Sequence, residues 1–362
     1  TFRGLVRGAF RMKSFALWCD AKNAGESTGV KVLMNFNLWA EAEKGESHTV
    51  LDVGVMLIPE EKSSKRKQIC EVVKSISFYC PFPLEKKNFE NLFPKMDNKT
   101  VGAIFNSPCN YTKNDIYSVG YVTLYGDDAY PKFAICSCDN VQFEEIDDKG
   151  TIVKIMLTNT MFPPESDREY EPIYYRFRLS GMFVSNLVAS SHSKDWLLTS
   201  AFSREEVIDF RFNDYRSLDD ERIIANIYGK NKDCVRINEI KVHFLLMSLM
   251  SIDVNSDSNE GKGRRLLEKD IWNDYAPCVK DFDNVAAWHW TKKLEKNDGY
   301  KINLMLRRHI CNWKTIVLYI LVLFVIDCFF NFSETVIMSL PVVENLLTHL
   351  KEALVSLSLT LL

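Results

Sequence analysis

Apolar and polar residues alternate along much of the first 250 positions, with the spacing of β-strands rather than of helices. Residues 29–38 place five apolar side chains on one face of a strand, namely Val30, Val32, Met34, Phe36 and Leu38. Residues 49–59 form a continuous apolar run, which is typical of a strand covered on both faces. Residues 141–146 and 151–157 flank Asp-Asp-Lys-Gly, and this arrangement predicts a hairpin. We therefore expect residues 12–250 to form a β-rich (α+β) domain, either a sandwich or a rolled sheet.

Helical signals are fewer, and the pattern changes after this domain. Ser217 can cap a helix whose isoleucines between positions 223 and 227 share one face. Residues 251–265 are polar and predict a linker or surface loop. Residues 266–314 begin with apolar positions at helical spacing and end in a basic stretch. We therefore predict a helical, basic juxtamembrane segment there.

Residues 315–332 (TIVLYILVLFVIDCFFNF) predict a transmembrane helix. Thirteen of these eighteen residues are Ile, Val, Leu or Phe, and Asp327 carries the one formal charge. As a helix the stretch is about 27 Å long, close to a hydrocarbon thickness of roughly 30 Å. Its apolar residues favour insertion by about 4 to 8 kcal/mol, against about 3 kcal/mol for a central aspartate. The buried core helix of a soluble protein is the alternative interpretation.

Charges beside this stretch predict its orientation. Arg307, Arg308 and Lys314 precede it with no acidic residue among them, whereas Glu334 follows it. Short basic flanks stay in the cytoplasm, and Trp313 is placed where an amphipathic ring meets the membrane interface. We therefore expect the large N-terminal domain to be cytoplasmic.

Residues 333–362 are predicted to form an amphipathic or second transmembrane helix. Leucine and valine recur there at heptad spacing, which favours a homo-oligomer through this C-terminal helix. Glu344, His349 and Lys351 make insertion of an isolated copy unfavourable. In an oligomer these three residues and Asp327 would line a wet pore. An amphipathic anchor on membrane lipids, or a simple dimer zipper, is the alternative.

Composition narrows the remaining classes of function. The formal net charge of -3 gives no overall positive field that would hold a polyanion. The ten cysteines are irregularly spaced, which is typical of reduced thiols in the cytosol rather than of a disulfide framework. Residues 1–11 form a basic leader, which we interpret as an upstream extension rather than as part of the native fold.

No catalytic or cofactor motif is found in the sequence, and we predict no enzymatic activity, no cofactor and no metal site. Four arginines, Arg176, Arg178, Arg211 and Arg216, are interleaved with aromatic residues in strand-like segments. Guanidinium and aromatic groups on a sheet can bind phosphates and stack on bases, so these arginines are candidates for a ligand or nucleic-acid face. Cross-strand pairing on a solvated sheet face is the alternative.

Three stretches, MKSFALWCDAKNAG, TVLDVGVMLIPE and DFRFNDYRSLDDE, together with the layout of a cytosolic domain before an apolar segment, resemble the two-transmembrane effector proteins of bacterial retron anti-phage systems. The resemblance implies an inner-membrane protein kept silent by a reverse transcriptase and its RNA–DNA product. Once released, such an effector permeabilises the inner membrane and causes abortive infection. The alternative is a membrane-tethered binding or scaffold protein with a β-rich recognition domain and a dimerising tail.

Overall fold

The structure is a computed structural model in which the chain forms two compact units. The first unit comprises Thr1–Ser191 with Glu205–Arg308, and the second comprises His192–Arg204 with His309–Leu362. The residues that the structure describes are 13–26, 28–40, 42–43, 46–47, 49–60, 69–126, 131–146, 150–157, 172–181, 184, 187–191, 203–228, 231–256, 261–276, 279, 282–295, 298–309, 313–338, 345–346 and 348–352. The predicted basic leader, residues 1–11, lies outside them.

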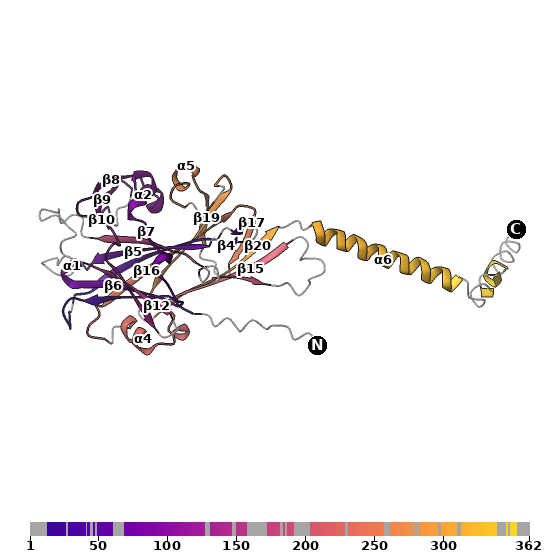
Figure 1. Ribbon diagram of the computed structural model, residues 1–362, viewed down its shortest axis with the longest axis horizontal. Helices are drawn as coiled ribbons and strands as arrows, with labels where there is room; N and C mark the ends of the chain where they lie inside the picture. The colour runs from indigo at the N-terminus through magenta and orange to yellow at the C-terminus, as the bar shows by residue number, and fades with distance from the viewer. Residues whose placement is uncertain are drawn as a thin grey trace. The chain divides into compact units, whose positions relative to one another are not determined.

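A ten-stranded sheet forms the centre of the first unit (Figure 1). Its strands in spatial order are β18 (Gly261–Leu266), β19 (Val285–Leu294), β16 (Ile237–Leu249), β2 (Val30–Trp39), β5 (Val50–Pro59), β13 (Ile173–Leu179), β10 (Lys132–Cys136), β9 (Val119–Leu124) and β8 (Cys109–Asn114), with β7 (Phe89–Asn91) paired to β13. Most neighbours are antiparallel, but β16 runs parallel to β2 and β10 runs parallel to β13.

Three further sheets accompany it among the described residues, and none of the sheets is closed. One four-stranded sheet has the order β1 (Ala16–Ala21), β6 (Val73–Cys80), β12 (Gly150–Met156) and β11 (Val141–Ile146). The other has the order β14 (Val188–Ser191), β15 (Ser203–Phe212), β20 (Tyr300–His309) and β17 (Ile252–Ser256). The third is a small pair of β3 (Ala42–Glu43) and β4 (Glu46–Ser47).

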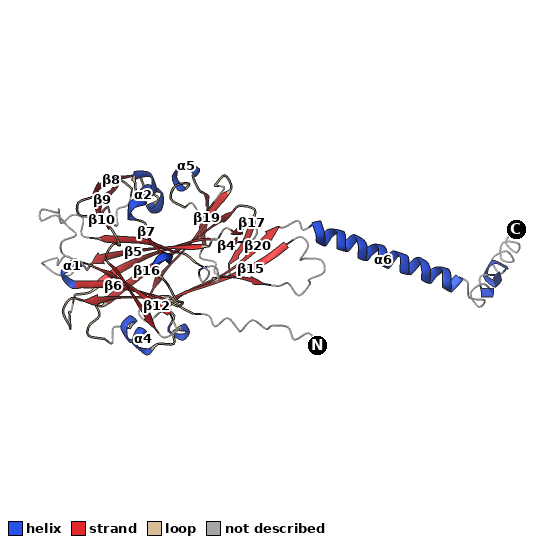
Figure 2. Cartoon of the chain, in the orientation of Figure 1, coloured by secondary structure: helices blue, strands red, loops and turns tan. Residues whose placement is uncertain are grey.

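The helices of the first unit are short and lie over the sheets (Figure 2). They are α1 (Ile69–Val72), α2 (Asn98–Phe105), α4 (Glu221–Ile227) and α5 (Lys269–Trp272), with 3-10 turns η1 (Lys86–Asn88), η2 (Phe93–Lys95) and η6 (Tyr215–Ser217). Figure 1 shows α2 and α5 on one side of this unit and α4 on the other. The buried apolar residues of this unit form three clusters.

The main core joins the ten-stranded sheet to both four-stranded sheets. Phe36 of β2 packs against Phe78 of β6, with ring centroids 6.4 Å apart, and against Phe210 of β15, at 4.8 Å. A second cluster contains Trp39 and covers the opposite face of the ten-stranded sheet beneath α2 and α5. The third cluster packs Ile223 of α4 against β1, β6 and β12. The first unit is therefore built in layers.

The strand predictions are confirmed where the apolar pattern was clear. The five apolar residues predicted to share one face of residues 29–38 are all in the main core. Every residue of β5 from Val50 to Ile58 is buried, as its continuous apolar run predicted. The hairpin forms between β11 and β12, where a Cβ atom on Gly150 would lie 2.2 Å from the Cys80 carbonyl oxygen. This close approach explains the glycine that follows the turn.

Other predictions are corrected. The predicted linker 251–265 contributes β17 and β18, and the predicted helical segment 266–314 contributes β19 and β20 beside the short α5. Both β17 and β18 are edge strands, where polar residues are favoured, so their composition resembled that of a loop. The predicted helix is α4, which begins at Glu221 and is therefore capped by Asp220 and not by Ser217. The Asp220 carboxylate accepts hydrogen bonds from two backbone amides.

The second unit contains α6 (Trp313–Met338), the longest helix that the structure describes. Within it, Ile316–Ser333 forms a window of 18 residues with mean hydropathy 2.3, of which none is buried. This window is long and apolar enough to cross a membrane, in agreement with the prediction of an apolar helix over residues 315–332. In residues 333–362, the described part beyond α6 is helical at 345–346 and 348–352.

Candidate functional site

A pocket of about 500 Å³ opens on the face of the ten-stranded sheet that also carries α2. Alternate strand residues point to the same face, so its floor includes Asn35 of β2, His243 of β16 and His289 of β19. Phe244, the next residue along β16, points into the main core instead. The residues that line this basic pocket are Leu33, Asn35, Ala103, Ile104, Phe105, Asn106, Lys241, His243, Leu245, Gly263, Arg264, Arg265, Ala287 and His289.

Positive charge dominates the lining of the basic pocket. Lys241, Arg264 and Arg265 contribute three cations, and none of the described lining residues is Asp or Glu. The side chains of Lys241 and Arg264 are exposed, and within the described part of the chain neither forms an ion pair. The pocket therefore favours an anionic ligand.

Arg265 is held by the C-terminal end of α2. Its guanidinium donates to the Asn106 side-chain oxygen at 2.6 Å and to the Ala103 carbonyl oxygen at 2.9 Å. Asn106 is the C-cap and adopts a left-handed conformation, with φ 51°, which asparagine tolerates better than most residues. These bonds fasten the edge strand β18 to α2, and they fix one wall of the pocket.

Two histidines stack in the floor of the pocket. The rings of His243 and His289 have centroids 5.1 Å apart and planes 18° from parallel. His243 Nδ1 and His289 Nε2 are 2.9 Å apart, so one of these nitrogens donates a hydrogen bond to the other. The two residues are diagonal neighbours, since His243 pairs with Thr291 across β16 and β19.

A buried charge cluster lies next to the basic pocket. Asp52 of β5 is fully buried and accepts two hydrogen bonds from Arg178 of β13, at 2.6 and 3.1 Å, and one from the Trp39 indole at 2.9 Å. In the register of β5 and β13, Arg178 lies directly opposite Asp52, and this pairing brings the two side chains together. A bidentate pair of this kind is among the stronger ion pairs in proteins.

Arg176 adds a second buried guanidinium to the cluster. It donates to the hydroxyls of Tyr275 and Tyr174, and it lies 3.7 Å from an Asp52 carboxylate oxygen. Gly54, opposite Arg176 in β5, leaves room for the Tyr174 ring, because a Cβ atom there would lie 2.1 Å from the Tyr174 hydroxyl. Arg176 also lines a small extension of the basic pocket.

The charge cluster changes the protonation of its members. Burial raises the pKa of the Asp52 carboxyl, but the charge and hydrogen bonds of Arg178, together with the Arg176 charge, hold it below its ordinary value. Burial also raises the pKa of the Tyr275 phenol far above its usual range. Asp52 is therefore ionised and Tyr275 is neutral at physiological pH.

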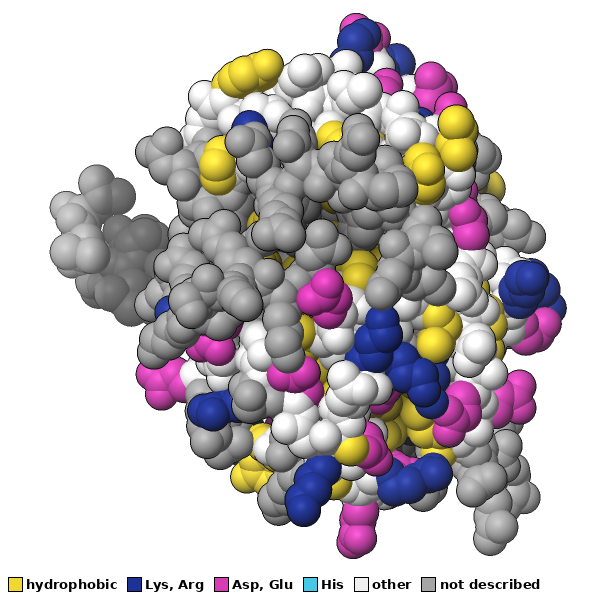
Figure 3. All heavy atoms as spheres, turned by 90° about the vertical axis from the view of Figure 1, so that its left-hand side faces the viewer, with side chains coloured by type: hydrophobic (Ala, Val, Ile, Leu, Met, Phe, Trp, Pro, Cys, Tyr) yellow, Lys and Arg dark blue, Asp and Glu magenta, His cyan; other side chains and the backbone are white. Residues whose placement is uncertain are grey.

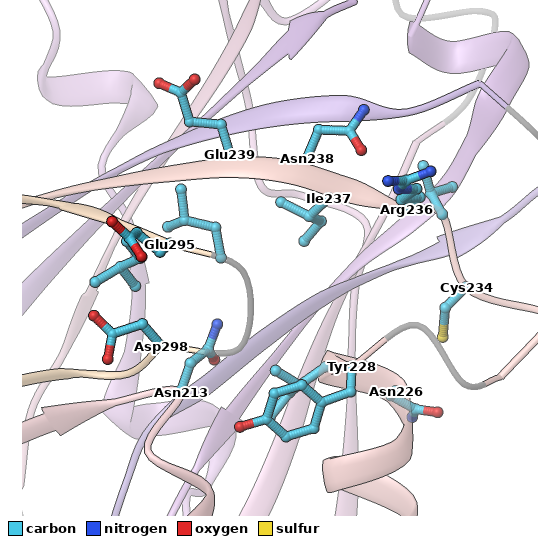
Figure 4. Close-up of a pocket in the computed structure, with 14 residues that line it drawn as sticks. Asn213, Asn226, Tyr228, Cys234, Arg236, Ile237, Asn238, Glu239, Glu295 and Asp298 are labelled. Atoms are coloured by element: carbon cyan, nitrogen blue, oxygen red, sulfur yellow. The ribbon is translucent and has the colours of Figure 1, made fainter.

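A second pocket, of about 350 Å³, lies beside the beginning of β16 (Figure 4). Its carboxylates are partly engaged already, because Glu239 pairs with Lys293 at 2.9 Å and Asp298 pairs with Lys292 at 3.1 Å. Burial, with some help from nearby carboxylates, raises the pKa of Cys234 to about 12, so its thiol is protonated and a poor nucleophile. This pocket is less suited to hold an anion than the basic pocket.

The face of the molecule in Figure 3 mixes both signs of charge. Lys and Arg side chains lie beside Asp and Glu side chains there. The part of this face that the structure describes carries no extended patch of a single sign, in keeping with the formal net charge of -3.

The prediction that four arginines form one ligand face is wrong for Arg176 and Arg178. Their exposed fractions are 1% and 4%, because β13 is covered on both faces. The sequence did not reveal that Asp52, more than 120 positions away, would lie opposite Arg178. The two arginines hold the fold together instead of meeting a ligand at the surface.

Arg211 lies in β15 and Arg216 in the 3-10 turn η6 that follows it, and both form local contacts. Arg211 binds Asp209 at 3.0 Å and Asp214 at 3.3 Å, and these contacts raise the pKa of its guanidinium. Arg216 is largely exposed and lies 3.3 Å from Asp214. These pairs lie within one strand and the turn after it, so they are not the cross-strand pairs of the alternative interpretation.

Two of the predicted orientation residues lie within the first unit. Arg307 binds Glu205 at 2.8 Å, and Arg308 binds Glu206 at 2.9 Å and the Ala40 carbonyl oxygen at 2.7 Å. They fasten β20 to its neighbours in the folded protein rather than standing free beside the apolar helix.

The other membrane candidates lie in the second unit. Trp313 begins α6 and is 66% exposed, and Lys314 follows it. Asp327 accepts a hydrogen bond from the Asn331 side chain at 3.2 Å, one turn further along α6. His349 and Lys351 are exposed on a helical segment, with His349 3.6 Å from Glu352, and Glu344 lies outside the described residues.

Sequence reasoning missed the basic pocket. Arg264 and Arg265 fall in the segment 251–265 that was predicted as a linker or surface loop. The alternation Lys241, His243, Leu245 in β16 was the available signal, because it places polar residues on the face opposite the main core. Their meeting with β18 and α2 depends on pairing over long sequence distances.

No family model and no curated protein matches the chain. Among solved structures, the chain is similar to leukotriene A4 hydrolase from Saccharomyces cerevisiae, with 8% identity, a TM-score of 0.31, and coverage of 79% of this chain and 30% of that chain. It is also similar to an M1 zinc metallopeptidase from Deinococcus radiodurans, with 9% identity, a TM-score of 0.26, and coverage of 78% and 43%. The chain spans less than half the length of either protein, and likeness at this level carries no argument about activity.

Proposed function

We propose that this protein is a membrane-anchored effector of bacterial antiviral defence, whose α6 spans the inner membrane and whose C-terminal helices permeabilise it. The observation that carries the proposal is the exposed apolar surface of α6, in which no part of the window Ile316–Ser333 is buried. Soluble proteins rarely expose an apolar surface of this size to water, and a bilayer would cover it.

The length of α6 suits this role. Its 26 residues span about 39 Å, which exceeds a hydrocarbon core of roughly 30 Å and leaves the ends at the interfaces. Trp313 at its start would then occupy an interface, where tryptophan is enriched. The proposed cytoplasmic placement of the first unit rests on the Lys and Arg residues that precede α6 in the sequence, because basic residues beside a transmembrane helix favour the cytoplasmic side.

Permeabilisation would arise from assembly of several copies. The Asp327 carboxylate and the Asn331 amide lie on one face of α6, and polar groups inside a bilayer favour packing against one another or around water. His349 and Lys351 would extend this polar lining toward the C-terminus. The same residues are unfavourable for an isolated helix, so oligomerisation and pore formation would occur together.

The resemblance to retron effectors supplies the biological setting. In that setting a reverse transcriptase and its RNA–DNA product hold the protein silent, and phage attack releases it. The released effector breaches the inner membrane and kills the infected cell before phage progeny mature.

Uptake of propidium iodide by bacteria induced to express the chain alone tests the effector function. We expect uptake and growth arrest with the intact chain, and neither with a chain that ends at Lys314, because that chain lacks α6. Asp327→Leu should stay in the membrane fraction but lose most of the uptake, since it removes the polar group proposed to line the pore. Phe332→Leu, an apolar exchange in the same helix, is the matched control and should behave like the intact chain.

Toxicity of the chain that ends at Lys314 would refute the membrane mechanism. An intact chain that reaches the membrane but admits no dye, and leaves growth unchanged, would instead favour a membrane-tethered binding protein. The basic pocket supports that second candidate function, because a tethered recognition unit needs a ligand site but no pore.

A further inference from the structure

Among the described residues, no acidic side chain balances the charge of the basic pocket. On β19, the strand between those that carry Lys241 and Arg264, the cations Lys292 and Lys293 each have an acidic partner. Lys241 and Arg264 have no such partner within the described part of the chain, and the lining offers no carboxylate. Two neighbouring cations without partners repel each other, and a bound anion would remove that repulsion.

The buried charge cluster next to the pocket adds to this field. Two guanidiniums, those of Arg176 and Arg178, are buried with one fully buried carboxylate, that of Asp52. Glu90 lies 3.7 Å from Arg178. Arg176, although buried, lies among the residues of the small pocket that adjoins the basic pocket, so its positive charge is close to the site.

The rest of the lining is apolar. Leu33, Ile104, Phe105 and Leu245 are half-buried side chains on the floor and the α2 wall. Phe105 packs against Phe133, with ring centroids 4.6 Å apart and planes tilted by 53°. A volume of about 500 Å³ lies within the usual range for small-molecule pockets, roughly 300 to 1,000 Å³.

We propose that the basic pocket binds a nucleotide, with its phosphates on Lys241 and Arg264 and its base on the apolar lining. Lysine and arginine bind phosphate oxygens through charge-assisted hydrogen bonds, and a flat base suits a half-buried apolar floor. A single nucleotide fits better than a nucleic-acid strand, because a strand needs a basic track that a net charge of -3 does not provide. This inference goes beyond the proposed function and does not depend on membrane insertion.

Calorimetric titration of the full chain in detergent micelles with ADP tests this site. Pyrophosphate and adenosine, titrated separately and as competitors, report on the phosphate and base parts of the ligand. We expect ADP to bind with a stoichiometry of one per chain, and each fragment to compete with at least tenfold lower affinity.

Two variants identify the pocket. Lys241→Glu combined with Arg264→Glu should weaken ADP binding at least 100-fold, since each lost charge-assisted contact costs about tenfold or more. Asn35→Asp, nearly isosteric, places a negative charge in the floor and should weaken ADP binding about tenfold. The matched controls are Lys74→Glu combined with Lys301→Glu, and Asn110→Asp, all at exposed positions outside the pocket.

Absence of ADP binding by the intact chain would overturn the proposal, as would ADP binding that the pocket variants leave unchanged. Pyrophosphate binding as tightly as ADP would overturn the assignment of a base to the apolar lining. A single-stranded RNA that binds more tightly than ADP, with the same sensitivity to the pocket variants, would replace the nucleotide by a nucleic acid. Circular dichroism of each variant confirms that the fold is retained.

Discussion

Asp52 is the residue on which the centre of the first unit most depends. It is a fully buried carboxylate that receives hydrogen bonds from Arg178 and Trp39, residues of the two strands that flank β5. Its loss would leave the Arg178 guanidinium buried without its principal counter-charge, and an uncompensated buried charge is costly. The three strands are therefore joined by side-chain chemistry as well as by backbone hydrogen bonds.

We predict that Asp52→Asn lowers the free energy of unfolding by about 3 to 5 kcal/mol, because one partner of a buried ion pair is removed. Urea unfolding followed by tryptophan fluorescence measures this. Asp283→Asn, which breaks the exposed pair of Asp283 with Lys269, is the control and should change the free energy by at most about 1 kcal/mol. Equal effects of the two variants would contradict the role given to Asp52.

The same pair sets a pH dependence. Because the pKa of Asp52 is lower in the folded protein than its ordinary value of 3.8, the ionised carboxylate stabilises the fold above that value. This stabilisation is lost as the pH falls through the lowered pKa. The unfolding midpoint of the wild type should therefore fall more steeply than that of Asp52→Asn between about pH 5 and pH 2.

At the residue scale, the sequence predicted which apolar side chains are buried better than it predicted which charges are. The alternation around Phe36 fixes its direction locally, since every second residue shares a face. The burial of Arg176 and Arg178 depends on Asp52 and Tyr275, which lie on distant segments. Local pattern carries no information on such partners, so the two arginines resembled a solvated face.

At the element scale, strands were predicted where the apolar pattern is clear: β2 alternates apolar and polar residues, and β5 is a continuous apolar run. The segments that form β17 and β18 were not predicted as strands, because both are edge strands, where polar residues are favoured. Residues 266–314, which contain β19 and β20, begin with apolar positions at helical spacing, and this local pattern predicted a helix. The apolar window of α6, Ile316–Ser333, lies within one residue of the predicted 315–332 at each end, since an apolar run needs no tertiary partner to be recognised. The helix itself extends to Met338.

Close packing between β5 and β13 gives a prediction at this scale. Gly54→Ala would place a methyl group 2.1 Å from the Tyr174 hydroxyl, which also accepts a hydrogen bond from Arg176. We expect a loss of about 1 to 3 kcal/mol in the free energy of unfolding, measured by urea titration. Gly102→Ala in α2 is the control and should stay within about 1 kcal/mol of the wild type. A neutral Gly54→Ala would show that the two strands pack less tightly than described.

At the scale of the whole molecule, the chain forms two units with different surface properties. The first unit carries a layered β-fold with a buried charge cluster and a basic pocket. The second carries an apolar helix whose window Ile316–Ser333 is long enough to cross a membrane.

Extraction of bacterial membranes with alkaline carbonate tests the central claim, that α6 spans a bilayer. The intact chain should stay in the membrane pellet, because inserted helices resist this treatment. A variant with Leu321→Lys and Val325→Lys should pass into the supernatant, since two central lysines cost about 5 to 7 kcal/mol, comparable to the gain from the apolar residues. Release of the intact chain into the supernatant would contradict the account.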